Sequence, residues 1–141
     1  MQFLYRESIV THMENFGTAN PGDTVSIQLF PAARHEGIVG WDGYIISRSR
    51  RFGGVVSLAP SVFSDGRLRD NHGYIGALDP EETIRRAEGL IGERGYDVMS
   101  NNCVHFVNWV NGLHPDSRMS DNFLQRPSLS EVAKNFLWPR W

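Results

Sequence analysis

The chain has 141 residues, enough for one domain with a hydrophobic core, and its 40% hydrophobic and 21% charged residues exclude an intrinsically disordered protein. A formal net charge of -2 gives no electrostatic drive toward nucleic acid. The single cysteine excludes an internal disulfide and a zinc site built on several cysteines.

The N-terminal and central sections predict a short helix followed by an antiparallel meander. Apolar residues at helical spacing ahead of Gly17 predict an N-terminal helical extension over residues 1–19. Beyond it, β-branched and alternating apolar runs are separated by turn signals such as Asp42-Gly43, which is typical of a tight hairpin. The expected strands are 24–30 (half-buried), 35–41, 44–48, 55–58 and one or two within 67–75.

The C-terminal half predicts helices. Asp79-Pro80-Glu81-Glu82 is typical of a helix start, and Gly92 of its end. Asn101 and Asn102 are expected to cap a second helix that Gly112 ends, and residues 129–137 predict a last helix. The fold class is therefore α+β, an antiparallel sheet meander packed against helices. We expect a single domain over residues 1–141, with an extension at 1–19, a core at 20–113 and a C-terminal loop and helix at 114–141.

Cys103 is predicted to lie in the first turn of the second helix. The positive end of the helix dipole and the unpaired backbone N–H groups there favour the thiolate, which is the form that attacks a carbonyl carbon. A lone cysteine is equally typical of a small core side chain, so the choice depends on whether the chain supplies a base.

His35 is the candidate general base, because it begins a predicted strand directly after a break and can project into the edge of a cleft. A hairpin around Asp42-Gly43 is expected to place Ser47 roughly opposite His35. Ser47 would then accept the second ring N–H of His35 and fix its tautomer, as the third member of a triad does.

These residues resemble the lecithin:retinol acyltransferase-like family, the circularly permuted branch of the NlpC-type, papain-like thiol hydrolases. The resemblance is carried by His35 with Gly37-Ile38-Val39 and Asp42-Gly43, and by Asn102-Cys103-Val104-His105-Phe106. It implies a permuted papain-like fold with His35 as base and Cys103 as nucleophile. Ser47 stands where many animal members have a second histidine. His105 matches the motif histidine but is not assigned as the base.

The function that follows is a cysteine-dependent hydrolase or acyltransferase that forms an acyl-thioester on Cys103. The substrate would be a lipid ester or an amide or peptide carbonyl, and backbone N–H groups at Asn102 and Cys103 would hold the oxyanion. A catalytically inactive module that binds a ligand or partner on the same fold is the alternative, motivated by Ser47. A hydrolase that acts on another cell's protein or lipid is a third hypothesis.

We expect neither a cofactor nor a metal, since His12, His72 and His114 lack metal-ligand spacing. The expected partner is a small-molecule lipid, acyl or peptide substrate, with no nucleic acid and no transmembrane segment. The aromatic tail, residues 136–141, permits weak contact with a membrane surface, although packing on the sheet or on a partner subunit is favoured. The N-terminus lacks a signal-peptide pattern, so we expect a cytoplasmic protein; the oligomeric state is left open.

Overall fold

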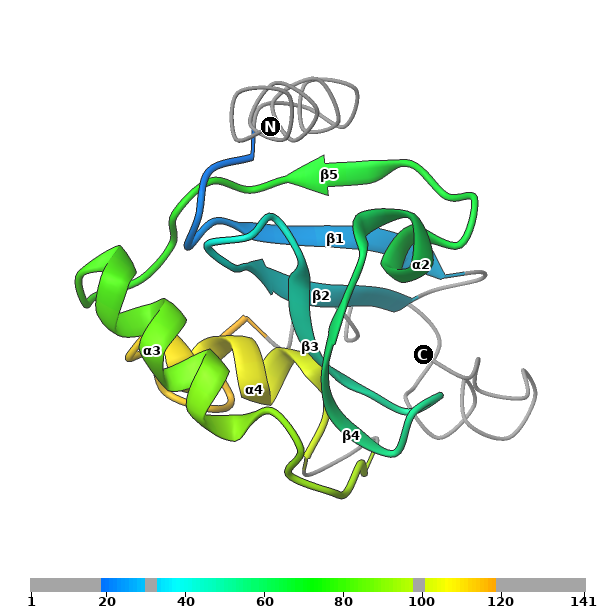
Figure 1. The fold of residues 1–141 in the computed structure, drawn as a ribbon. Coiled ribbons are helices and arrows are strands. Elements are labelled where there is room, and N and C mark those ends of the chain that lie inside the picture. The colour runs from blue at the N-terminus through cyan, green and yellow to red at the C-terminus, as the bar shows by residue number, and fades with distance from the viewer. Residues whose placement is uncertain (1–18, 30–32, 98–100, 119–141) are drawn as a thin grey trace.

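The computed structural model describes residues 19–29, 33–97 and 101–118, which form one antiparallel sheet with helices packed against it (Figure 1). The predicted α+β class is confirmed. The strands are β1 (Thr24–Leu29), β2 (Ala33–Val39), β3 (Ile45–Ser49), β4 (Gly54–Leu58) and β5 (Arg69–Asn71). The helices are α2 (Pro60–Ser64), α3 (Pro80–Leu90) and α4 (Cys103–Val110).

The strand order is β4-β3-β2-β1-β5, with every neighbouring pair antiparallel. The first four strands form the expected meander. The fifth does not continue it: after α2 the chain returns to the far edge of the sheet, where Val25–Ile27 of β1 pair with β5. The prediction of a simple meander is therefore wrong for the last strand.

Two boundaries and one helix also differ from the prediction. The strand expected at 35–41 lies at Ala33–Val39, because the turn already begins at Gly40, whose N–H donates to the Tyr44 carbonyl at 2.8 Å. Helix α2, which begins with Pro60 and is only 5 residues long, was not predicted. The predicted N-terminal and last helices lie outside the described residues.

Strand β1 is buried on both faces except at Gln28, whereas the sequence predicted a half-buried strand. The polar residue Ser26 of this strand is fully buried, and its hydroxyl has hydrogen-bond partners. It contacts His72 Nε2 at 2.7 Å and accepts a hydrogen bond from Arg34 Nε at 3.1 Å. A buried hydroxyl needs such partners. Ser26, a polar residue of the alternating pattern, therefore belongs to a hydrogen-bond network and does not face solvent.

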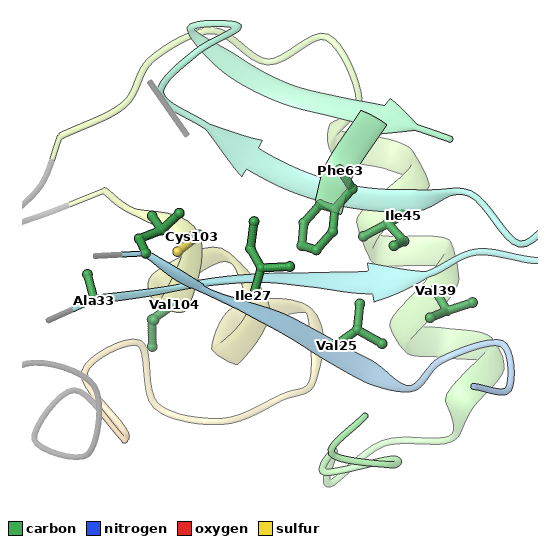
Figure 2. Packing of buried hydrophobic residues seen from close by; sticks show 9 residues of the cluster. Val25, Ile27, Ala33, Val39, Ile45, Phe63, Cys103 and Val104 are labelled. Carbon is green, nitrogen blue, oxygen red and sulfur yellow. The ribbon is translucent and has the colours of Figure 1, made fainter. Parts of the chain in front are cut away.

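Helix α4 joins two hydrophobic clusters. The first contains Val25, Ile27, Leu29, Ala33, Val39, Ile45, Phe63, Cys103 and Val104. Figure 2 shows Cys103, Val104 and Ala33 at one end of this cluster and Val25, Val39 and Ile45 at the other. The second contains Ile38, Ile46, Val55, Ala87, Phe106, Val107 and Val110. The start of α4 therefore packs into one cluster while its remaining turns pack with α3 and the strands of the other.

Gly37 is a position where the close approach of β2, β3 and α2 requires a glycine. A Cβ atom there would lie 2.5 Å from Ile45 Cγ2 and 3.2 Å from the Phe63 ring. Both neighbours are buried core side chains, so neither can move without disturbing the packing.

We predict that Gly37→Ala lowers the free energy of unfolding by about 1–3 kcal/mol, the usual cost of overpacking a core. Gly89→Ala in α3 is the matched control, because its added methyl would meet nothing within 4 Å and alanine favours a helix. Urea unfolding followed by circular dichroism measures both. Equal effects of the two substitutions would contradict the packing described here.

Candidate active site

Cys103 is the first residue of α4, and the helix start is fixed by Asn102. The Asn102 side chain accepts hydrogen bonds from the backbone N–H groups of Val104 at 2.9 Å and His105 at 3.0 Å. The Asn102 N–H in turn donates to His105 Nδ1 at 3.3 Å, which completes a capping box. The predicted cap at Asn102 and the first-turn position of Cys103 are confirmed.

The cysteine sulfur lies against the backbone of β2, on the side away from β1. The Val39 N–H donates to the Asp23 carbonyl at 3.0 Å, which sets the alternation of the β1–β2 ladder, so the backbone groups of even-numbered β2 residues point away from β1. On that side, Cys103 Sγ–H donates to the Arg34 carbonyl at 3.7 Å, and the Glu36 N–H points at the sulfur. The thiol thus contacts the chain immediately before and after His35.

Burial dominates the ionisation of this thiol. Cys103 is 2% exposed, and loss of solvent raises its pKa to about 12, with the Glu36 carboxylate adding to the rise. The backbone N–H groups of Glu36, Cys103 and Val104 oppose this shift. The helix start therefore does favour the thiolate, as the sequence predicted, but burial of the thiol outweighs this effect.

His35 is equally buried. Its side chain is 1% exposed and stacks on Phe63, with ring centroids 5.0 Å apart and an interplanar angle of 27°. Burial lowers the pKa of the imidazole to about 3, so the ring is neutral at physiological pH. The fold thus places a neutral imidazole and a neutral thiol in the same buried region.

Ser47 lies on β3 but not directly across from His35. Ile38 pairs with Ile46, and continuing this register puts Ser47 opposite Gly37, one diagonal step from His35 on the same face. The hydroxyl of Ser47 is buried and has no hydrogen-bond partner among the described residues. The expected pairing of the two strands is confirmed, but the register differs: Gly40 bonds to Tyr44 at the turn, and the same register puts Ser49, not Ser47, opposite His35.

The His105 ring stabilises the start of α4 and is not assigned as a base for the Cys103 sulfur. Because its Nδ1 accepts the Asn102 N–H, its proton lies on Nε2, which contacts Asp116 Oδ1 at 3.0 Å. This explains why a histidine two residues after the cysteine need not act as its base.

Sequence reasoning missed Glu36, which acts on the Cys103 thiol, and the two polar residues linked to it, Arg118 and Asn108. The Glu36 carboxylate, 3% exposed, forms a two-pronged ion pair with Arg118, whose two terminal nitrogens lie 3.0 and 3.1 Å from its oxygens. Arg118 also donates to the Asn108 side-chain oxygen from Nε at 2.9 Å. A glutamate inside a predicted strand was the available signal, because a charge in an otherwise apolar strand requires a partner.

Other ligand classes find little support within the described residues. No group of three or more His, Cys, Asp or Glu side chains there is arranged to hold a metal ion. None of the helices in this part of the chain has the length and apolar content to cross a bilayer.

The cap of α4 can be tested by stability. Asn102→Ala removes two hydrogen bonds to the first turn and is expected to lower the free energy of unfolding by about 1 kcal/mol or more. Asp79→Ala is the matched control, since Asp79 occupies the same position on α3 but makes no side-chain capping bond. Its expected cost is a few tenths of a kcal/mol. A control that costs as much as Asn102→Ala would contradict the capping role.

The buried histidine predicts a pH dependence. Its pKa is lower in the folded protein than the ordinary value of 6.5, so between pH 6.5 and about 3 the unfolded chain binds a proton that the folded one does not. Its contribution to stability is present above this window and is lost as the pH falls through it. The stability of wild type relative to His35→Gln should therefore decrease from pH 7 to pH 4, measured by urea unfolding. Parallel curves would contradict it.

A comparison with known protein families matches the segment of the chain that contains Cys103 and the start of α4. The family model described as lecithin retinol acyltransferase matches residues 63–112, from α2 to the end of α4. Human lecithin retinol acyltransferase is 45% identical over 49 residues, which are 35% of this chain and 21% of the relative's length. The family match includes Cys103 and ends before Arg118, and it begins after His35 and Ser47. Over this segment, the chain is similar to the lecithin retinol acyltransferase family.

Proposed function

We propose that this chain is a cysteine-dependent hydrolase or acyltransferase, with Cys103 as nucleophile and His35 as general base. The observation that carries the proposal is the position of the Cys103 sulfur at a capped helix start, against the backbone on both sides of His35. The permuted papain-like arrangement implied by the resemblance, with the base strand before the nucleophile helix, belongs to the same proposal.

The proposed reaction starts from neutral partners. His35 takes the proton of Sγ as the sulfur attacks the substrate carbonyl carbon, so that no free thiolate need accumulate in the buried site. The protonated imidazole then gives this proton to the leaving group as the carbonyl re-forms and leaves an acyl-thioester on Cys103. Water or an acceptor hydroxyl or amine resolves the thioester, and its proton passes to His35 and then to the departing sulfur.

The capping box narrows the choice of oxyanion donors. Three of the four N–H groups from Asn102 to His105 donate inside the box. The remaining one, the N–H of Cys103, already points at the sulfur region and is the proposed donor to the developing oxyanion.

Ser47 is proposed as the group that orients the imidazole. It lies on the face of β3 that His35 shares on β2, and its hydroxyl has no partner among the described residues. It can therefore accept the second ring N–H of an imidazolium as that charge forms. A hydroxyl stabilises this charge less than a carboxylate does, so the expected contribution is small.

A lipid ester is the proposed first substrate class, because the human relative is named for acyl transfer with lecithin and retinol. An amide or peptide carbonyl is the alternative substrate. The second candidate function is a catalytically inactive binding module, and the burial of Cys103 favours it.

The decisive experiment is trapping of the acyl-enzyme. Purified protein is incubated with a p-nitrophenyl ester of a fatty acid and with a phosphatidylcholine, and its intact mass and modified residue are determined by mass spectrometry. We expect one acyl group on Cys103, removed by neutral hydroxylamine as a thioester is. The Cys103→Ala variant should not be acylated.

His35→Gln should slow acylation by about 100-fold or more, the usual contribution of a general base, and Ser47→Ala by less than about tenfold. Circular dichroism confirms that each variant is folded. Acylation that persists in Cys103→Ala, or no acylation of the wild type by either ester, would sink the enzyme hypothesis and favour the binding module.

A further inference from the structure

Glu36 is a buried carboxylate beside the proposed nucleophile. It follows His35 on β2, its backbone N–H points at Cys103 Sγ, and its side chain is 3% exposed. Across the β1–β2 ladder it faces Ser26, which carries no charge. Among the described residues, Glu36 shares its surroundings with Arg34, Asp70, His72 and Arg118, and its carboxylate acts on the Cys103 thiol.

Arg118 neutralises this carboxylate and ties it to the cysteine helix. Its two terminal nitrogens bind both oxygens of Glu36, and its Nε and one terminal nitrogen bind the Asn108 oxygen on α4 at 2.9 and 2.6 Å. Asn108 is itself held by the carbonyls of Pro115 and Ser117, at 2.9 and 2.5 Å. One guanidinium therefore joins β2, α4 and the turn of residues 113–118.

The backbone at Arg118 shows how firmly this arrangement is held. Its φ is 62°, in the left-handed region that residues other than glycine rarely adopt. Such a conformation persists where the surroundings determine it, and here the four hydrogen bonds of the guanidinium supply that constraint.

We propose that Arg118 is a positioning residue of the active site, which holds and neutralises Glu36 so that this buried carboxylate opposes loss of the Cys103 proton less strongly. The proposal rests on the function proposed above. Without Arg118, an uncompensated anion would remain buried next to the sulfur, and Coulomb repulsion would disfavour a second negative charge there. Consistent with this, the Glu36 carboxylate raises the pKa of the thiol even with Arg118 present.

The test is the pH profile of alkylation at Cys103, the only cysteine of the chain. The full chain and its variants are treated with iodoacetamide between about pH 7 and pH 10.5, and modification is followed by intact mass. His72 does not interfere, because its pKa is lowered, first by burial and then by Arg34, and it is neutral throughout this range. The variants are Arg118→Gln, Arg118→Lys, Glu36→Gln and the double variant Glu36→Gln/Arg118→Gln.

Arg118→Gln should shift the profile to higher pH by about half a unit or more, which is an about threefold loss of rate at a fixed pH on the rising limb. The double variant should return the profile to the wild-type position or below, and Arg118→Lys should restore part of the shift. Arg85→Gln, which removes an exposed arginine paired with Glu82 on α3, is the control and should leave the profile in place.

A purely structural role would lower the rate or the stability, and this loss would not be reversed by Glu36→Gln. An unshifted Arg118→Gln profile overturns the inference. If that variant does not fold, the profile of Glu36→Gln decides: a shift to lower pH supports the inference and an unchanged position overturns it. Acyl-enzyme trapping is a separate readout, so a shifted profile without acylation would refute the proposed function and retain the control of Cys103 ionisation by Arg118.

Discussion

The site depends on the docking of the α4 start against an edge of β2 that β3 leaves open. β1 pairs with β2 along its whole length, but β3 is paired only at Ile38 and Val39. The backbone groups of Arg34 and Glu36 on that side are therefore available to the cysteine sulfur. Because backbone groups inside a protein must be satisfied, the same contact that completes the sheet edge also fixes the Cys103 sulfur beside His35.

This docking sets a conflict between packing and reactivity. A thiol that fills a hydrophobic cluster is stabilised as a neutral group, and ionising it at neutral pH would cost several kcal/mol. Protonation of the His35 imidazole is likewise unfavourable, since burial disfavours its cation. In the proposed reaction, proton transfer concerted with the attack avoids a preformed thiolate–imidazolium pair, in which burial disfavours both charges.

Much of the scaffold could be predicted from the sequence, because strands β1 to β4 and the starts of α3 and α4 are encoded by local patterns. Period-two alternation and the Asn102 cap act within a few residues. The return of β5 to β1, the open edge of β2 and the pairing of Glu36 with Arg118 join residues far apart in the chain, and no local signal specifies them. The ionisation of Cys103 was misjudged for the same reason, since burial is a tertiary property.

The spacing of Asn102, Cys103 and His105 has a physical basis once the capping box is known. A cap residue and the third residue of its helix exchange hydrogen bonds, so Asn102 and His105 must be three apart, and the first helical position between them belongs to Cys103. The His105 ring also contacts Asp116, which lies in the same turn as Arg118. Asp116 is 73% exposed, so its contact orients the ring more than it stabilises the fold. The turn of residues 113–118 thus holds both the helix that positions the sulfur and the carboxylate that influences its charge.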